Sequence, residues 1–353
     1  MNRREFLKST GAAAAAATAA AAVTEAATAA PEGIAAPALA CGATELRLAI
    51  GWPDGVAGPA DQARRLGQRI TAMSGGRYRI ACAAGAANGL AAVRAGDADL
   101  YYASEHDHLE AHRALAYFAG LPGNRALGAR QLSAWMLVGG GQQAWDDLAG
   151  EFGVKAMLAG HAGERPYFLA TRRMDDVSEF PGGKVAVMGL ARDVARGLGL
   201  VPVALPASDV AGALVRGELL AAELGGAIAS HALGLFDAAG VFVGASLNRT
   251  GSAMSLGLRR SLWDGLSASD RAIFTAAAAA EYDLALAEEE THRRLLTAGK
   301  AWPVARDLSR TIRGIGDAVV AHVAAADAHA QRINAGYVAF RRALLGDEAP
   351  LTS

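Results

Sequence analysis

Residues 46–50 read Leu-Arg-Leu-Ala-Ile, residues 78–82 read Tyr-Arg-Ile-Ala-Cys, and residues 98–102 read Ala-Asp-Leu-Tyr-Tyr. Each stretch is short, mostly apolar and bounded by glycine, proline or polar residues, which is typical of β-strands. Between them, Ala60–Met73 and Gly89–Ala95 carry apolar residues at helical spacing. This alternation of strands and helices predicts a parallel sheet covered by helices.

A second unit of the same kind lies further along the chain. It has a strand, a helix, a strand, a helix and the beginning of a strand at Lys184–Val187, Ala191–Leu198, Val201–Leu205, Ala207–Arg216 and Ala221–Leu224. The remainder, Ser267–Leu345, is rich in alanine with helical periodicity, and we expect breaks around Gly299–Pro303 and near Gly314. The pattern predicts an α/β fold with two lobes and long C-terminal helices.

Length and composition agree with two lobes. The chain has 353 residues, which is enough for roughly two domains of about 150 residues each. With 52% hydrophobic and 20% charged residues it can bury two cores, and a disordered chain is excluded. The formal net charge of −1 leaves no basic excess to neutralise phosphates, so a nucleic-acid partner is not expected.

The first 29 residues have the features of an export signal. The pair Arg3 and Arg4 precedes a weakly hydrophobic, alanine-rich run over 11–23, and Ala27-Thr28-Ala29 offers a signal-peptidase site. The run is too short and too rich in alanine for a membrane span, which needs about 20 strongly apolar residues. We interpret residues 1–29 as a twin-arginine signal peptide that directs a folded protein to the periplasm and is then cleaved.

The two cysteines of the chain, Cys41 and Cys82, cannot form a disulfide scaffold or a four-cysteine zinc site. Cys41 precedes the first expected strand and Cys82 lies late in the second. In parallel neighbours they would be about 20 Å apart at about 3.3 Å per residue, so a disulfide is not expected. Lipidation of Cys41 is an alternative, although Ala38 stands where a lipobox has leucine.

Several short motifs carry a resemblance to a known family. They are Trp52-Pro53, Met73–Arg77, Val93–Asp99, Ala134-Trp135, Gly139–Gln142, Trp145–Leu148, Glu151–Gly153, Phe180–Lys184 and Leu205–Ala207. In this order and spacing they resemble the solute-binding proteins of tripartite ATP-independent periplasmic (TRAP) transporters, the DctP type. The nearest branch is associated with α-keto acids, other carboxylates and so-called mannitol/chloroaromatic compounds. The resemblance covers about residues 45–345.

The resemblance implies two α/β lobes joined by crossing strands, with a long helix across both. We therefore expect lobe I at 43–167 plus 253–300, lobe II at 168–252, and C-terminal helices at 301–345 that pack across the lobes. A hinge motion would close the lobes over a small, anionic carboxylate. The protein would deliver this solute to TRAP membrane subunits without a cofactor.

The ligand residues of the family can be compared with this chain position by position. Where the family has an arginine on the first strand of the second lobe, this chain has Ala186. The glutamine that helps to hold a metal ion in the carboxylate-binding branch corresponds to Arg165, and a further acid corresponds to Arg249. The family's Glu-Trp pair corresponds to Glu223-Leu224, so the acid is kept and the aromatic side chain is lost.

These differences change the charge of the expected site. A guanidinium has no acceptor atom and cannot bind a cation, so no metal is expected. Arg165 and Arg249 could instead take the place of the cation, pair with Glu223 and hold an anionic ligand bidentately. The alternative is a degenerate cleft with a role other than transport, in which both arginines are solvated at the rim. Trp52 and Tyr101, at the carboxyl ends of expected strands, are candidates for the cleft wall, with core packing as the alternative.

A cluster of histidines supports a rival hypothesis. Glu105, His106, His108 and His112 lie within eight consecutive residues, 105–112. If the segment is helical, His108 and His112 share one face, as a zinc site requires, and His106 and Glu105 could complete the site. The chain would then be a periplasmic metal-binding protein. The alternative is a polar loop beside the mouth of the cleft.

Catalysis is not expected, because the chain has no Gly-x-Ser-x-Gly, His-Glu-x-x-His or phosphate-loop lysine motif. Gly139-Gly140-Gly141 lacks the spacing of a dinucleotide-binding loop and predicts a kink between two helices. Apolar positions in the C-terminal helices could support a homodimer; they include Ile312, Ile315, Val319, Val320 and Val323.

Overall fold

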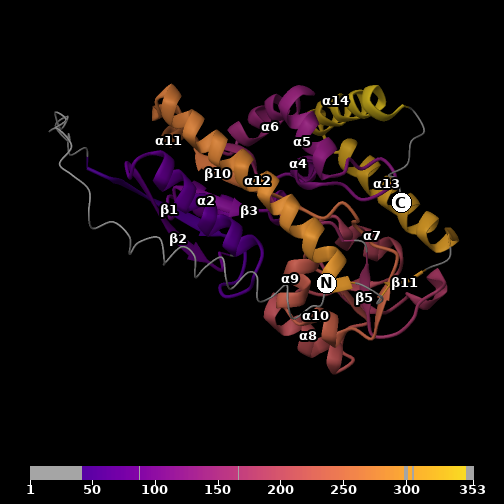
Figure 1. The fold of residues 1–353 in the computed structure, drawn as a ribbon. Helices are drawn as coiled ribbons and strands as arrows, with labels where there is room; N and C mark the ends of the chain where they lie inside the picture. Colours follow the sequence, from indigo (N-terminus) through magenta and orange to yellow (C-terminus); the bar gives the residue numbers. More distant parts are fainter. Residues whose placement is uncertain (1–41, 87, 166, 298–300, 304–305, 347–353) are drawn as a thin grey trace, which may run out of the picture. The chain divides into compact units, whose positions relative to one another are not determined.

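The computed structural model describes residues 42–346 except for 87, 166, 298–300 and 304–305. It contains two β-sheets with helices packed on them, within one compact unit, Ala43–Ser353 (Figure 1). The signal segment 1–29 and Cys41 lie outside the described residues. We refer to each sheet with its helices as a lobe, numbered in chain order.

The first sheet has five strands in the order β2-β1-β3-β10-β4. They are β1 (Thr44–Ile50), β2 (Tyr78–Ala84), β3 (Leu100–Ala103), β4 (Val154–His161) and β10 (Ala253–Arg259). The parallel pairing of β1 with β2 and β3 confirms the prediction from the first repeated unit. β10 runs antiparallel between β3 and β4. Cys82 is exposed on β2 and lies opposite Leu48 of β1.

The second sheet has six strands in the order β11-β9-β5-β8-β6-β7. They are β5 (Phe168–Ala170), β6 (Lys184–Val187), β7 (Val201–Pro202), β8 (Ala221–Glu223), β9 (Val241–Val243) and β11 (Ala301–Trp302). β6 pairs in parallel with β7 and β8, as the second unit predicts. β5 runs antiparallel between β8 and β9. Each sheet therefore includes a strand of opposite direction that connects it to the other sheet.

Helices supply most of the remaining chain. Those of the first lobe are α2 (Pro59–Met73), α3 (Gly89–Ala95), α4 (Ala116–Ala119), α5 (Ala129–Val138), α6 (Gly141–Gly150) and α11 (Arg260–Gly265), with 3₁₀ turns η1 (Glu105–His108) and η2 (Arg113–Leu115). The second lobe has η3 (Val177–Glu179), α7 (Ala191–Gly197), α8 (Ala207–Val215), α9 (Ala227–Ala232) and α10 (Leu235–Ala238). The C-terminal helices are α12 (Ala268–Thr297), α13 (Arg306–Ala324) and α14 (Ala328–Leu345). Within the described ranges no helix is long and apolar enough to cross a membrane.

Local sequence explains where α2 begins and ends. Pro59 opens the helix because its φ is already helical and its missing N–H would be unpaired there. The Asp61 carboxylate accepts a hydrogen bond from the Gly58 amide at 3.2 Å. Leu66 faces the sheet and is fully buried. Gly75 follows the last turn with a φ of 61°, a conformation that costs glycine little because it has no Cβ.

Two connecting segments and one helix cross between the lobes. Residues 162–167 connect β4 to β5, and residues 244–252 connect β9 to β10. The two segments are hydrogen-bonded, since the Ala162 amide donates to the Ser252 carbonyl at 2.8 Å. Helix α12 packs on β4 and α2 of the first lobe and on α9 of the second (Figure 1). The three connections together form the junction between the lobes.

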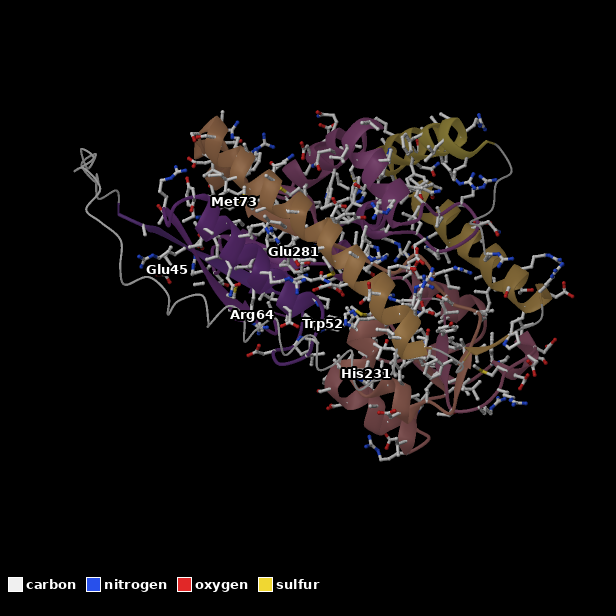
Figure 2. The ribbon with its side chains drawn as sticks, viewed as in Figure 1. Glu45, Trp52, Arg64, Met73, His231 and Glu281 are labelled. Carbon is white, nitrogen blue, oxygen red and sulfur yellow. The ribbon has the colours of Figure 1, made fainter. Side chains whose placement is uncertain are left out.

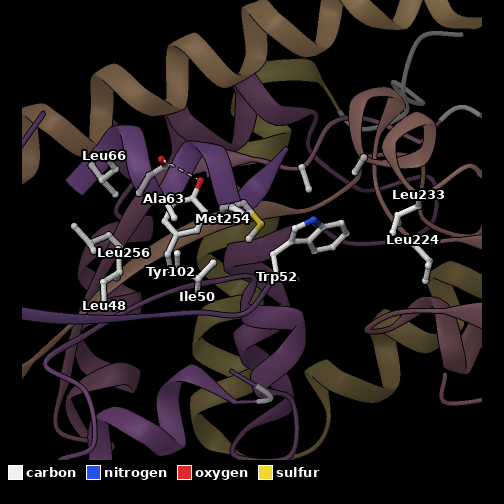
Figure 3. Close-up of a cluster of buried hydrophobic side chains, with 14 of the residues drawn as sticks. Leu48, Ile50, Trp52, Ala63, Leu66, Tyr102, Leu224, Leu233, Met254 and Leu256 are labelled. Atoms are coloured by element: carbon white, nitrogen blue, oxygen red, sulfur yellow. Dashed lines mark hydrogen bonds between the residues drawn. The ribbon is translucent and has the colours of Figure 1, made fainter. Parts of the chain in front are cut away.

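The cores show that the lobes are in contact. One apolar cluster continues from β1 and α2 of the first lobe to the second lobe, where it includes Leu224 and Leu233 (Figure 3). A second cluster surrounds the buried Trp135 and Trp145, and a third lies between the second sheet, α7 and α13. The apolar positions proposed for a dimer belong to these intramolecular clusters; Ile312 and Val323 are buried, and Ile315, Val319 and Val320 pack against them.

Three details of the fold differ from the expectation or refine it, whereas the kink at Gly139–Gly141 is confirmed between α5 and α6. The expected strand Val201–Leu205 is shorter and ends at Pro202, after which the Val203 amide makes one more hydrogen bond, to the Val185 carbonyl at 2.9 Å. The break expected around Gly299–Pro303 contains the short strand β11, which extends the sheet edge at β9.

The third difference concerns Gly314, where a break was expected. Helix α13 continues through Gly314, and the helical region is interrupted instead before Asp327, whose side chain accepts a hydrogen bond from the Ala330 amide and caps α14. A single glycine costs a helix only about 1 kcal/mol relative to alanine. Burial of Leu308 and Ile312 on the same helix outweighs that cost.

Candidate functional site

Arg165 lies on the first crossing segment, and only 3% of its surface is exposed. Its Nη2 donates to Ser252 Oγ at 2.7 Å, and its backbone amide donates to the Arg249 carbonyl at 3.0 Å. Nε and Nη1 have no hydrogen-bond partner in the described part of the chain. A buried guanidinium with open donors is costly for folding, but it is what recognition of an anion requires.

Glu223 ends strand β8 and is buried on the second-lobe side of the same region. Its Oε2 accepts from the Leu247 amide at 2.8 Å and its Oε1 from the Asn248 amide at 2.9 Å. Burial raises the pKa of Glu223, and the positive charge of Arg165 opposes that rise. The second crossing segment therefore holds this carboxylate in place through its backbone.

Arg165 and Glu223 line one small cavity of about 20 Å³. Its wall also includes Tyr167, Gly226 and Phe236 of the second lobe. This volume has room for about one water molecule. A solute with several carbon atoms does not fit this cavity as it stands.

Two further acids act on the Arg165 guanidinium. Asp107 belongs to η1 of the first lobe and Glu289 to α12, and together with Glu223 they favour the charged form of Arg165, although its burial lowers its pKa. Burial also raises the pKa of Asp107 to about 6 and that of Glu289 to about 7. The surroundings of Arg165 thus contain one cation and three acids.

Two buried histidines complete these surroundings in their neutral form. Burial and the nearby Arg165 charge lower the pKa of both His106 and His161 to about 3. His161 Nδ1 accepts a hydrogen bond from the Gly163 amide at 3.0 Å. His106 Nε2 lies 3.3 Å from Asn248 Nδ2, which links η1 of the first lobe to the second crossing segment.

Glycines allow the crossing segments to approach each other and α12. The Glu289 carboxylate accepts from the Ala227 amide at 3.0 Å, at the beginning of α9. Gly163 has a φ of 87°, and a Cβ on it would overlap this carboxylate. Gly251 has a φ of 72°, and a Cβ there would overlap the Gly163 carbonyl. Larger residues would therefore disrupt the junction beside Arg165.

Trp52, proposed for the cleft wall, lies where the lobes meet. It follows β1, is 5% exposed and faces Gly225 of the second lobe (Figures 2 and 3). Its indole Nε1 has no partner among the described residues. Leu224 and Ala186 are buried in the same apolar cluster as Trp52. The three positions that the sequence analysis proposed thus lie in one apolar cluster, in which Leu224 and Ala186 offer only apolar surface.

Tyr101 and Arg249 lie away from the Arg165 guanidinium. The Tyr101 hydroxyl donates to Glu105 Oε1 at 2.8 Å, and the ring packs edge-to-face on His108 within the first-lobe core. Arg249 has an exposed side chain in a separate groove of about 680 Å³, where Arg130 also lies. Only the Arg249 carbonyl contacts Arg165. One arginine, not two, is therefore buried beside Glu223.

The histidine cluster does not form the expected helical face, because residues 105–115 fold into two 3₁₀ turns. His108 Nδ1 lies 3.0 Å from Glu105 Oε2, whereas His112 caps η2 and its Nε2 contacts Asp327 at 3.1 Å. His106 points to the crossing segment instead. Within the described ranges, no three His, Cys, Asp or Glu side chains are grouped to hold a metal ion.

Sequence reasoning did not identify Asp107, Ser252 or Glu289 as neighbours of Arg165. Asp107 lies within the histidine cluster, whose composition was the available signal. Glu289 is the middle of three consecutive glutamates on α12, of which the other two are less buried. Its contact with α9 depends on long-range packing and leaves no local signal.

The comparisons with known proteins agree with this architecture. No family model matches the chain. The chain is 27% identical over 293 residues to the monocarboxylate 2-oxoacid-binding periplasmic protein of Nostoc sp., and the match covers 79% of each chain.

Two solved structures illustrate the structural likeness. A TRAP transporter solute-binding protein of Bordetella bronchiseptica, with calcium and picolinate bound, has a TM-score of 0.78 and 22% identity over 86% of this chain and 93% of its own. A TRAP periplasmic solute-binding protein of Pseudoalteromonas atlantica, with sodium and pyruvate bound, has a TM-score of 0.78 and 19% identity over 86% and 95%. The chain therefore has the two-lobed fold of the TRAP solute-binding proteins, as the sequence resemblance implies. These relatives are binding proteins rather than enzymes.

Proposed function

We propose that this protein is the solute-binding component of a TRAP-type transporter and delivers a small carboxylate to the membrane subunits. The observation that carries the proposal is the buried guanidinium of Arg165 with two open donors at the junction of the lobes. The relatives support the substrate class, since one is a monocarboxylate 2-oxoacid-binding protein and the two solved structures have picolinate or pyruvate bound.

The geometry supports bidentate recognition of the carboxylate. Ser252 accepts one Nη2 hydrogen and fixes the plane of the guanidinium. The open Nε–H or Nη1–H, together with the second Nη2 hydrogen beside it, can then donate to the two oxygens of a carboxylate. Closure of the lobes removes this pair from water and strengthens it. The junction formed by residues 162–167, residues 244–252 and α12 would act as the hinge.

A metal ion does not fit this site, although the two solved relatives contain calcium or sodium. Arg165 is itself a fixed positive charge beside Glu223, and a guanidinium offers no acceptor atom. Each oxygen of Glu223 already accepts a backbone amide. We therefore assign the positive charge of the site to Arg165 and no role to a cation. The rival zinc site over 105–112 is not favoured.

The remaining assignments complete the proposal. Residues 43–167 with 253–300 would form lobe I, 168–252 lobe II, and the C-terminal helices would pack across both. The relatives are periplasmic proteins, which supports a periplasmic location for this chain. Residues 1–29 would be the cleaved signal peptide, and a homodimer gains no support from the apolar positions that α13 buries within the chain.

Titration of the mature protein with carboxylates tests the proposed function. Thermal shift and calorimetry should identify a carboxylate that stabilises the protein by mass action. Arg165→Ala should weaken its binding at least about 30-fold, since losing one partner of a desolvated ion pair costs roughly 2–5 kcal/mol. Arg79→Ala, an exposed arginine on β2, is the matched control and should bind normally. If no carboxylate binds, the degenerate-cleft alternative holds.

Export is tested separately by replacing Arg3 and Arg4 with lysine. Fractionation should then find the protein in the cytoplasm, because twin-arginine signals are read by a dedicated receptor. Efficient export of the double variant would instead indicate a general secretory signal.

A further inference from the structure

Acids and cations face the same cavity. Glu164 and Glu223 line its wall together with Arg165 and Arg293, and the Arg293 Nη2 forms an ion pair with Glu290 at 2.5 Å. Asp107 and Glu289 also act on Arg165, although neither lines the cavity. The neutral histidines His106 and His161 add no positive charge at neutral pH. A monoanion bound to Arg165 would therefore lie beside the Glu223 carboxylate.

Glu223 and Asp107 both retain capacity to bind a donor. Glu223 shares the cavity wall with Arg165, and each of its oxygens accepts one backbone amide, which leaves lone pairs free. In the part of the chain that the structure describes, neither Glu223 nor Asp107 forms an ion pair, because the Arg165 guanidinium bonds to Ser252 instead. The site thus combines open donors on one residue with an unpaired carboxylate on the next.

We infer that the solute is a zwitterion whose carboxylate binds Arg165 and whose ammonium group binds Glu223, with Asp107 as the second acid. The inference rests on the proposed function and specifies the substrate class of the same site. An ammonium group brings three donors and one positive charge, which match the free lone pairs and the negative charge of Glu223. The solute as a whole is neutral, so its entry leaves the net charge of the closed site unchanged.

Calorimetry with matched pairs of ligands tests this inference on the unmodified mature protein. Each pair consists of an α-amino acid and the 2-oxo acid with the same carbon skeleton, such as glycine with glyoxylate, L-alanine with pyruvate, and L-leucine with 4-methyl-2-oxopentanoate. For the best-fitting skeleton at pH 7 and low salt, the amino acid should bind at least 10-fold more tightly than the 2-oxo acid. The corresponding amino alcohol, which lacks the carboxylate, should bind at least 10-fold more weakly than the amino acid.

Variants identify the residue that selects the ammonium group. Glu223→Gln should reduce the preference for the amino acid over the 2-oxo acid at least 10-fold, and Asp107→Asn should reduce it by a smaller factor. Glu281→Gln, another buried acid but one that contacts Arg65 on α2, is the matched control and should leave the preference unchanged. If Glu223→Gln does not fold, the ligand pairs and Asp107→Asn still decide the question.

The outcomes separate the inference from the proposed function. If a 2-oxo acid binds as tightly as its amino acid or more tightly, the inference is overturned and the proposed function stands. Binding of the amino alcohol with the affinity of the amino acid would overturn the pairing of the carboxylate with Arg165. If no member of any pair or of the wider carboxylate series binds, both fail. A preference that neither acid variant changes would also overturn the assignment to Glu223 and Asp107.

Discussion

Arg65 and Arg165 both lie near α12, but their guanidinium groups differ in their partners. Arg65 is paired with carboxylates, whereas most of the Arg165 donors are open. Arg65, on α2, donates from Nε and Nη2 to Glu281 Oε1 at 3.1 and 2.6 Å and from Nη2 to Glu288 Oε2 at 2.8 Å. Its side chain is 31% exposed. Arg165 is far more buried, yet among the described residues its guanidinium has Ser252 as its hydrogen-bond partner, and Nε and Nη1 stay open. Figure 2 shows Glu281 where α12 passes α2.

The difference separates a structural from a functional arginine. Removing a charge from water costs several kcal/mol, and paired acids with good geometry offset that cost. Glu281 and Glu288 offset this cost for Arg65, and their ion pairs hold α12 against α2. At Arg165 the nearby acids Asp107, Glu223 and Glu289 favour the charged form, but in the described part of the chain none of them accepts a hydrogen bond from the guanidinium. Its open donors therefore remain available to a ligand. Four experiments test this difference between the two arginines.

The largest expected effect is that of Arg165→Met, which should weaken solute binding strongly but change stability little. Methionine fills a similar volume without a charge, so solute affinity should fall at least about 30-fold. The free energy of unfolding should change by at most about 1 kcal/mol, because removal of a buried charge offsets the lost attraction to Asp107, Glu223 and Glu289. Urea unfolding and calorimetry measure the two quantities. Clear destabilisation by this variant would show that Arg165 is structural.

Glu281→Ala should have the reverse pattern. It removes the main partner of Arg65 and leaves that guanidinium half-paired with Glu288, so stability should fall by about 2–3 kcal/mol. Solute affinity of the folded protein should remain within about threefold of the wild type, since Glu281 does not line the cavity. Glu288→Ala, which removes only the contact of Arg65 with Glu288, is the control. It should lower stability by less than about 1 kcal/mol, because the pair is partly exposed. A large loss of affinity in Glu281→Ala would contradict the separation of the two regions.

Glu289→Gln should change how stability depends on pH. The pKa of Glu289 is about 7 in the folded protein against 4.5 for the ordinary group, so the folded state binds the extra proton. The contribution of this group to stability therefore increases as pH falls through about 7 towards 4.5. From pH 8 to pH 5.5 the wild type should gain about 1–2 kcal/mol relative to the variant. The buried His106 and His161 act in the opposite direction in both proteins and cancel in the comparison. Parallel curves for the two proteins would refute this assignment.

Chelation should have the smallest effect. Because Arg165 supplies the positive charge of the site, treatment with EDTA should leave solute affinity unchanged within about twofold. Calorimetry before and after dialysis against the chelator measures this. If affinity is lost and then restored by calcium or sodium, Glu223 is a metal ligand and Arg165 has another role.

The sequence predicted the elements better than their interactions. Alternating apolar stretches were sufficient for the parallel core of both sheets, because strand and helix periods are local signals. The crossings at β5 and β10 came from the family resemblance rather than from any pattern. The 3₁₀ turns at 105–115 were missed, since the same composition also suits a helix and only packing decides between them.

Within the site, the resemblance identified Arg165 and Glu223 as neighbours, and both line one cavity. It could not separate Arg165 from Arg249, because the two are joined through their backbones while their side chains diverge. Alternation along β3 makes Tyr101 and Tyr102 face opposite ways, but it did not show that both are buried, each in a different apolar cluster. Glu289 depends on contacts between distant elements and had no sequence signal, whereas for Asp107 the signal was the composition of the histidine cluster.

The position of Trp52 makes opening of the protein visible without a label. Of the five tryptophans, Trp135 and Trp145 are buried within the first lobe. Trp52 lies beside the second lobe instead, since a Cβ on Gly225 would be 3.6 Å from its ring. When the lobes part, water reaches this indole and relaxes around its excited state, so its emission moves to longer wavelength. Capture of a solute should reverse the shift, and rapid-mixing fluorescence of the native protein would then report the rate of closure directly.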